Sequence, residues 1–129
     1  MDKRTDILLA AAALALATGS GGARGDEPEV PEAVEACVSC HAFGPDEPVL
    51  EGPTLWGVVG RPVASVAGFD YSAALRSLGG AWTPERLDRF LASPQAYAPG
   101  TKMELGGVKS AADRAVVIEL LESLGPATP

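Results

Sequence analysis

The two cysteines and the single histidine of this chain fall in one five-residue stretch, Cys37-Val-Ser-Cys40-His41. Zinc sites with four Cys or His ligands and iron–sulfur clusters held by four thiolates are excluded, because one chain has too few such ligands. The length of 129 residues allows one domain. Only 5% of the residues are aromatic, so this small domain would struggle to build a core alone. We therefore expect the Cys-His motif to decide what the chain folds around.

Three interpretations of this motif compete. A disulfide or thioredoxin-type redox pair is possible, but a thioredoxin motif starts a helix after a strand, and no β-branched run precedes Cys37. A lone metal site would have three ligands of mixed type and no fourth nearby. The third interpretation is the C-x-x-C-H pattern of c-type haem attachment, in which the thiols add to two haem vinyl groups and the imidazole ligates iron. Thiols three residues apart share one face of a helix, which suits this third chemistry.

A methionine far along the chain supports the haem interpretation. Electron-transfer haems commonly take a methionine thioether as a second axial ligand, which raises the reduction potential. Beyond the first 25 residues the chain has one methionine, Met103, at the end of Tyr97-Ala-Pro-Gly-Thr-Lys-Met103. A methionine usually fills a gap in a core. This loop, rich in Pro and Gly, places Met103 outside any helical apolar stripe, so we expect it to be a ligand.

The first 25 residues have the pattern of a secretory signal peptide. Lys3 and Arg4 precede an uncharged run over residues 7–17, and small residues follow. As a helix this run would rise only about 16 Å, against a hydrocarbon core of about 30 Å, which favours cleavage over an uncleaved anchor. We expect cleavage between residues 17 and 25, a flexible lead-in over residues 26–31, and a soluble periplasmic protein without a stable membrane anchor.

The charge balance excludes several partners. Seventeen acidic residues against ten basic ones give a formal net charge of −7. Phosphate contacts need clustered Lys and Arg, and this chain has no basic run, so we expect no binding to nucleic acid. Adsorption to anionic lipid is disfavoured for the same reason.

Helical patterns and turn signals predict an all-α domain. Prolines and glycines end each candidate helix, while alternating patterns are short and scattered around residues 56–66, which we expect to form an Ω-type loop. Thr83 followed by Pro84 is a helix start, and Ser110 with Asp113 resembles a capping box. The last helix carries an apolar stripe that should pack on the first. The expected helices cover residues 32–40, 72–78, 83–91 and 110–124.

Together these residues resemble class I cytochrome c of the mitochondrial and photosynthetic-bacterial type, as an acidic exported bacterial member. The resemblance extends over most of the domain expected at residues 32–126. The matching segments are Cys37-Val-Ser-Cys40-His41, Gly52-Pro-Thr-Leu55, Gly57-Val-Val-Gly-Arg61, Gly68-Phe-Asp-Tyr71, Trp82, Leu87, Leu91, Ser93-Pro94 and Tyr97-Ala-Pro-Gly-Thr-Lys-Met103.

The resemblance implies short helices and Ω-type loops around one covalent haem c, and it implies a role for each matching residue. Cys37 and Cys40 would form the thioethers, and His41 and Met103 would be the axial ligands. Pro53 would accept a hydrogen bond from the His41 ring, which fixes the imidazole tautomer. Four further residues match positions that hydrogen-bond or neutralise the haem propionates: Arg61, Tyr71, Trp82 and Thr101.

Two departures from the family pattern lie on the expected methionine side of the haem. Phe90 stands where the family has a tyrosine whose hydroxyl approaches the methionine sulfur, and Leu75 stands where many members have an asparagine. Both replace polar atoms with carbon. We expect a drier, less hydrogen-bonded distal side and an altered reduction potential.

The resemblance implies a one-electron carrier rather than an enzyme, and a monomer. Two alternatives remain: a cytochrome subunit that accepts electrons from a periplasmic dehydrogenase, and a haem peroxidase or gas sensor, which would need Met103 to be absent or labile. Partners would be a membrane cytochrome complex, an oxidase, a reaction centre or a dehydrogenase. The lysine ring of mitochondrial relatives is mostly replaced by uncharged residues such as Ala36 and Gln95, although Lys102 and Lys109 remain. Docking should therefore depend weakly on salt or favour a neutral or basic partner.

Overall fold

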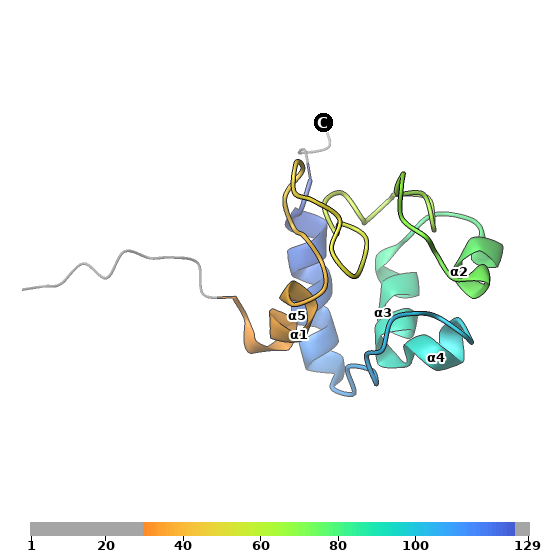
Figure 1. Cartoon of the computed structure of the whole chain (residues 1–129). Coiled ribbons are helices and arrows are strands. Elements are labelled where there is room, and N and C mark those ends of the chain that lie inside the picture. The colour runs from red at the N-terminus through yellow and green to blue at the C-terminus, as the bar shows by residue number, and fades with distance from the viewer. Residues whose placement is uncertain (1–29, 126–129) are drawn as a thin grey trace, which may run out of the picture.

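The computed structural model describes residues 30–125, and these fold into helices joined by long loops (Figure 1). The expected signal peptide and residues 26–29 of the lead-in lie outside the described residues. The five helices in this range are α1 (Glu32–Val38), α2 (Ala73–Leu78), α3 (Pro84–Ala92), α4 (Pro94–Tyr97) and α5 (Ala111–Ser123). Within residues 30–125 strand pairing is limited to one isolated bridge, between Pro62 and Ala81. The all-α prediction is confirmed.

Three helices begin at hydroxyl caps, and the sequence predicts two of these, Thr83 and Ser110. The side chain of Thr83 accepts a hydrogen bond from Arg86 N at 3.2 Å, with Pro84 as the first helical residue of α3. Ser110 accepts from Asp113 N at 3.2 Å and starts α5. Ser72 does the same at the start of α2. Each cap pairs a backbone N–H that would otherwise lack a partner inside its helix.

Helix α4 is absent from the sequence prediction, which stops the third helix before Pro94. The backbone at Ser93 is extended, with φ −159° and ψ 90°, so α3 ends there. Pro94 then takes the first position of a new helical turn. Proline is tolerated there, because a backbone N–H at this position would have no partner inside the helix. The first helix is shorter than expected and ends at Val38, so Cys40 lies just beyond its last turn.

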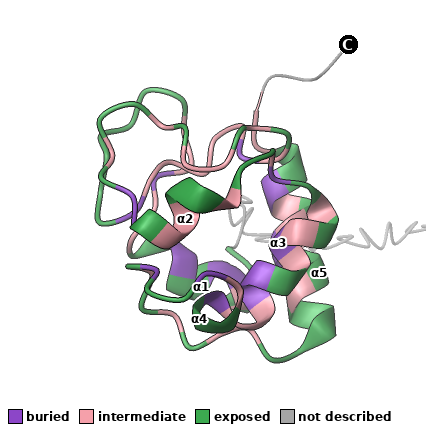
Figure 2. Ribbon diagram, turned by 90° about the vertical axis from the view of Figure 1, so that its right-hand side faces the viewer, coloured by how far each residue is buried: buried purple, intermediate pink, exposed green. Residues whose placement is uncertain are grey.

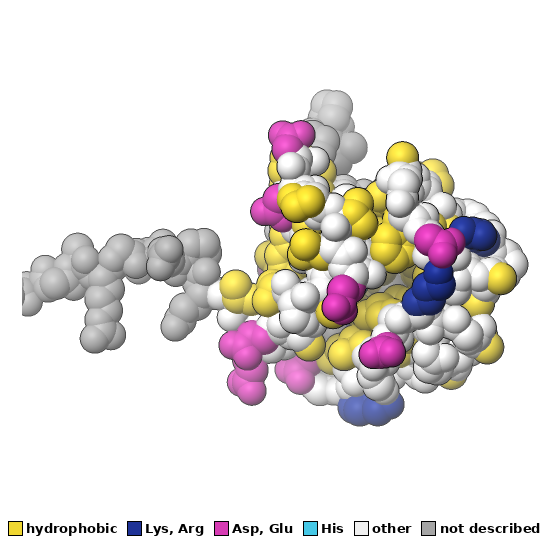
Figure 3. Space-filling model, in the orientation of Figure 1, with side chains coloured by type: hydrophobic (Ala, Val, Ile, Leu, Met, Phe, Trp, Pro, Cys, Tyr) yellow, Lys and Arg dark blue, Asp and Glu magenta, His cyan; other side chains and the backbone are white. Residues whose placement is uncertain are grey.

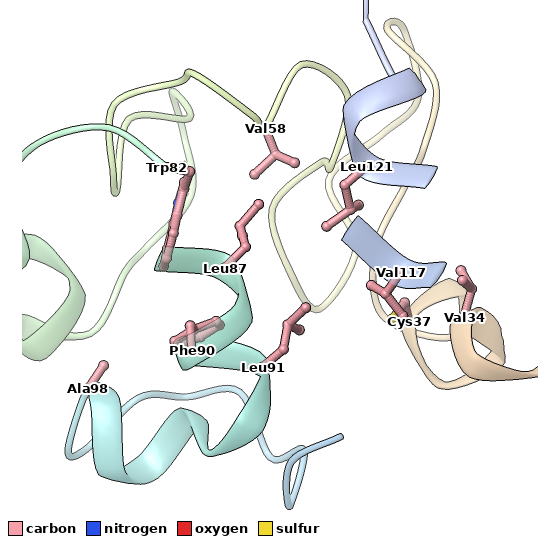
Figure 4. Close-up of a cluster of buried hydrophobic side chains, with 10 residues drawn as sticks. All are labelled: Val34, Cys37, Val58, Trp82, Leu87, Phe90, Leu91, Ala98, Val117 and Leu121. Atoms are coloured by element: carbon pink, nitrogen blue, oxygen red, sulfur yellow. The ribbon is translucent and has the colours of Figure 1, made fainter. Parts of the chain in front are cut away.

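The core lies where α1, α3 and α5 meet. Helix α5 packs against both α1 and α3, and Val117 and Leu121 from its predicted stripe are buried (Figure 4). The expected contact between the last and first helices is confirmed. Helix α2 has no buried residue and lies on the outside of the molecule (Figure 2). The buried hydrophobic cluster consists of Val34, Cys37, Val58, Trp82, Leu87, Phe90, Leu91, Ala98, Val117 and Leu121.

The segment from residue 39 to residue 72 has no helix and runs as a loop that crosses from the core to α2. Backbone hydrogen bonds fix its middle, from Gly57 N to Leu124 O at 2.8 Å and from Gly60 N to Trp82 O at 2.7 Å. The loop expected over residues 56–66 is therefore confirmed. None of the helices in residues 30–125 has the length and apolar character needed to span a bilayer.

Candidate haem site

A cavity of about 360 Å³ opens beside the core, and its wall is mostly apolar. Figure 3 views its open side, where hydrophobic side chains surround a hollow in the face of the molecule. Helices α1, α2, α3 and α5 and the loops on both sides of α2 all contribute to the wall. The wall includes all nine site residues predicted from the sequence: Cys37, Cys40, His41, Pro53, Arg61, Tyr71, Trp82, Thr101 and Met103.

The two thiols lie at the end of α1. Backbone N–H groups of Cys40 and His41 both donate to Cys37 O, at 3.2 and 3.0 Å, which continues the helical turn beyond Val38. The two thiols are free rather than joined in a disulfide. Burial raises the pKa of the Cys37 thiol, and the neighbouring Cys40 adds to this. Within residues 30–125 no three His, Cys, Asp or Glu side chains are grouped as metal ligands. The motif therefore presents two free thiols to an apolar cavity, and burial favours the protonated form of the Cys37 thiol.

The imidazole of His41 is held in one tautomer. Its Nδ1 lies 2.6 Å from Pro53 O. Because a carbonyl oxygen can only accept, Nδ1 must carry the hydrogen, and Nε2 keeps its lone pair. Burial lowers the pKa of His41, which the hydrogen bond to Pro53 opposes and the positive Arg61 reinforces. A neutral imidazole with a free Nε2 is the form that ligates a metal.

Gly52 supports this imidazole at a point the sequence analysis did not identify. A Cβ at Gly52 would lie 2.4 Å from Cε1 and 2.7 Å from Nδ1 of His41. The backbone N–H of Gly52 also donates to Cys40 O at 2.8 Å, which brings the loop against the end of α1. Only a residue without a side chain can approach the ring so closely.

We expect Gly52→Ala to displace the His41 ring and to lower the free energy of unfolding by about 1–3 kcal/mol, the usual cost of overpacking. The Soret band and the chemical denaturation curve of the haem-loaded protein would report both effects. Gly106→Ala is the matched control, because a Cβ there meets no atom within 4 Å. Equal stability and identical spectra for the two variants would contradict this role for Gly52.

The loop that carries Met103 is fixed by hydrogen bonds to its own backbone. Met103 N donates to Thr101 Oγ1 at 3.3 Å, and Thr101 N donates to Ala98 O at 2.9 Å. The Gln95 side chain donates to Thr101 O at 3.0 Å and reaches Met103 O at 3.5 Å. Gly100, with φ +88°, allows the turn that this path requires. Met103 is half-buried and lines the cavity from a loop that these hydrogen bonds hold in place.

One ion pair joins the Met103 loop to the loop before α2. Lys102 Nζ donates to Asp70 Oδ2 at 2.8 Å and to Asp70 O at 3.0 Å. Arg76 on α2 binds the other carboxylate oxygen of Asp70 at 2.7 Å. The hydrogen bond from Lys102 is the main reason that the pKa of Asp70 is lowered. The lysine beside Met103 is therefore already paired within the chain.

We expect Asp70→Asn to loosen the Met103 loop and to raise amide hydrogen exchange at Thr101 and Met103. Since the folded-state pKa of Asp70 is below its unfolded value, the ion pair stabilises the fold above the unfolded pKa, and this is lost as pH falls through the folded pKa. Asp88→Asn is the control, because it removes the ion pair with Arg114 between α3 and α5 and leaves the Met103 loop intact. Equal exchange rates at the Met103 loop in both variants would contradict this expectation.

Hydrogen-bond donors line the cavity from the loop before α2 and from Trp82, which lies between α2 and α3. Arg61 donates to Trp56 O and Thr54 O, both at 2.9 Å, and burial lowers its pKa. The Tyr71 hydroxyl accepts from Val66 N at 3.0 Å, so its own hydrogen remains to be donated. The indole N–H of Trp82 has no acceptor among the residues that the structure describes. A carboxylate in the cavity would give these groups an acceptor, as haem propionates require.

One of the two departures from the family pattern, Phe90, packs among other aromatic rings. The ring of Phe90 lies 5.2 Å from that of Trp82 and 6.0 Å from that of Tyr97, centroid to centroid. Leu75 lines the same cavity. The altered reduction potential expected from these residues stays a prediction, and the change Phe90→Tyr tests it by potentiometry: an unchanged potential would contradict it.

Arg86 is a structural residue that sequence reasoning missed. Its Nε donates to the Tyr97 hydroxyl at 3.0 Å, and one terminal nitrogen donates to Gly79 O at 2.8 Å and Ala81 O at 3.0 Å. The guanidinium also lies 5.7 Å from the centre of the Trp82 ring. It thereby joins α3, α4 and the end of α2 behind the cavity wall. Nothing in the local sequence distinguishes it from an ordinary surface cation.

The residues present fit one covalently attached haem c. Two free thiols, a fixed imidazole, a thioether and several donors that could bind a carboxylate surround one apolar cavity. A flat apolar macrocycle with two carboxylates needs this combination, because its body avoids water and its propionates need partners. This fit agrees with the cofactor that the sequence predicts.

Comparisons with known proteins were made with family models and with curated sequences, and the curated relatives that match are named cytochromes c. No protein-family model matches the chain. It is 50% identical over 90 residues to "Cytochrome c-type cyt cy" of Rhodobacter capsulatus and 45% identical over 92 residues to "Cytochrome c homolog" of Rickettsia prowazekii. These matches cover 70% and 71% of this chain but 44% and 53% of the relatives, so the chain spans about half of their length.

A shorter relative is matched over most of its length. The chain is 47% identical over 88 residues to "Cytochrome c 2.1" of Caenorhabditis briggsae, which covers 68% of this chain and 78% of that protein. The chain therefore belongs to the class I cytochrome c family.

Proposed function

We propose that this protein is a one-electron carrier with haem c attached through Cys37 and Cys40 and ligated by His41 and Met103. The observation that carries the proposal is that one apolar cavity collects both thiols, the thioether and an imidazole whose Nδ1 is bound to Pro53 O at 2.6 Å. The kinship with proteins named cytochrome c supports it. The bound haem supplies an iron that cycles between its ferrous and ferric forms.

The chain's own residues would prevent a substrate from binding at the iron. His41 and Met103 would both ligate the iron and leave it no open site for a substrate, and we propose a carrier rather than an enzyme. Pro53 fixes the hydrogen of His41 on Nδ1 and leaves the Nε2 lone pair free, so that it would be available to the iron. Arg61, Tyr71, Trp82 and Thr101 would hold the two propionates, the first by charge and the others by hydrogen bonds. Apolar residues of α3 and α5 line the cavity and would exclude water from a bound haem.

We further propose that the protein works after export. The support is the signal-peptide pattern of residues 1–25, followed by a lead-in and a haem domain at residues 32–126. The protein would then work in the periplasm, and its partner would be a redox protein that is accessible from that compartment.

Absorption spectra of the purified protein in both oxidation states, with a pyridine haemochrome assay, test the proposal. We expect thioether-linked haem and a weak long-wavelength band from sulfur bound to ferric iron. Carbon monoxide binding by the reduced protein would overturn the closed-site function and favour a sensor or peroxidase.

A further inference from the structure

Four exposed residues form the rim of the cavity: Ala36, Glu51, Lys102 and Glu104. They come from α1, from the loop after the Cys-His motif and from the Met103 loop. In Figure 3 acidic side chains lie beside the apolar hollow, and a neighbouring pair of opposite charges lies at one edge. If haem fills the cavity, this rim surrounds the edge through which electrons enter and leave.

The rim has an excess of negative charge. Its only cation, Lys102, is bound to the carboxylate of Asp70 at 2.8 Å and so offers little positive charge to a partner. Glu51 and Glu104 form no ion pair within residues 30–125; Glu51 only accepts a long hydrogen bond from Cys40 Sγ, at 3.5 Å. Two unpaired carboxylates thus flank the opening, and the chain as a whole carries −7.

Apolar surface adjoins these carboxylates. Val49 and Leu50 directly precede Glu51, and their side chains are 48% and 45% exposed. The backbone of Gly52 is bound to Cys40 O, so this segment is held at the edge of the cavity rather than free to fold away. Exposed apolar residues bordered by polar ones are typical of a protein interface.

We propose that this rim is the docking surface for a redox partner that presents lysine and arginine side chains around an apolar centre. The inference rests on the proposed function, because it assumes that electrons cross at the cavity mouth. Charge complementarity selects the occupant: Glu51 and Glu104 attract cations and repel a second copy of this acidic chain as well as an acidic protein face. The polarity is opposite to the docking by a lysine ring implied for mitochondrial relatives.

Two oxidants of equal and opposite charge test the proposal on the haem-loaded protein: tris(1,10-phenanthroline)cobalt(III), with charge 3+, and ferricyanide, with charge 3−. We expect added salt to slow oxidation by the cobalt complex and to speed oxidation by ferricyanide. The double change E51Q/E104Q should slow the cobalt reaction about fivefold at low ionic strength and should speed the ferricyanide reaction.

The matched control is E119Q/E122Q on α5, which makes the same change in net charge at residues outside the cavity wall. We expect it to alter either rate less than about twofold, since the Coulomb interaction with the oxidant weakens with distance from the cavity mouth. Equal effects of the two double changes would overturn the proposal, because net charge alone would then explain the rates.

A second readout needs no electron transfer. On titration with a short oligolysine peptide, we expect NMR shifts at Ala36, Leu50 and Glu104 that are weakened in E51Q/E104Q. Shifts confined to α5, or no binding at low salt, would overturn the docking surface. A protein that holds haem but exchanges electrons with neither oxidant would instead overturn the proposed function, so the two failures are distinguishable.

Discussion

Replacing both thiols, in Cys37→Ser and Cys40→Ser together, should yield a chain that retains little haem and loses most of its helical circular dichroism. The cavity of about 360 Å³ is lined mostly by apolar side chains, and without haem these side chains would face water instead of an apolar partner. A small domain has a total stability of only about 5–15 kcal/mol, so it tolerates little such exposure.

The measurements are haem extraction into acidified organic solvent and far-ultraviolet circular dichroism. Haem should stay with the unmodified protein and be extracted from whatever fraction of the variant retains it. Val38→Ser is the matched control, since it introduces serine on the same helix at a side chain that is 40% exposed. A double variant with full helix content and no haem would show that the fold does not depend on the group in the cavity.

Met103→Ala should open one axial position while leaving the haem attached. We expect the weak sulfur-to-iron band to vanish, the reduced protein to bind carbon monoxide, and the reduction potential to fall by more than about 0.1 V, since axial ligands set haem potentials over ~0.8 V. The rest of the loop should persist, because Gln95 and Thr101 hold it through backbone groups that the change does not remove.

Leu105→Ala is the control for this change. Leu105 lines the same cavity two residues along the same loop, and its removal deletes apolar contact without deleting a ligand. Its spectrum should keep the sulfur band, with only a modest loss of stability. If both variants keep the band, Met103 is not the ligand; if both lose it, the band reports loop packing rather than a bond.

The parts of the fold that the sequence predicts are those with local causes. Thr83 and Ser110 start helices because each hydroxyl reaches a backbone N–H three residues on. Helix α4 also has a local cause, because Pro94 suits a first helical position, but the same proline equally predicts the end of the preceding helix. The Cys-His motif and Met103 are recognisable because few other chemistries need those residue types.

The parts that escaped prediction join residues that are distant in the chain. Gly52 matters because the His41 ring lies against its backbone, and Lys102 because it reaches Asp70, 32 residues away. Neither contact leaves a periodic or local pattern in the sequence. Lys102 shows the consequence: the sequence suggests a free docking charge, whereas the structure shows a paired one, and the charge of the cavity mouth changes accordingly.

No single stretch of the chain encloses the cavity, whose wall extends from Ala36 to Leu121. If haem is attached near the start of the domain, Met103 closes the site by reaching a group already tethered to its own chain. Ligation then becomes an intramolecular event with a high effective concentration, and the entropic cost of closing so long a loop grows only slowly with its length. The weak donor strength of a thioether is sufficient under these conditions. Covalent attachment near the start of the domain thus allows the weak, reversible bond from Met103 to complete the haem site near the end of the domain.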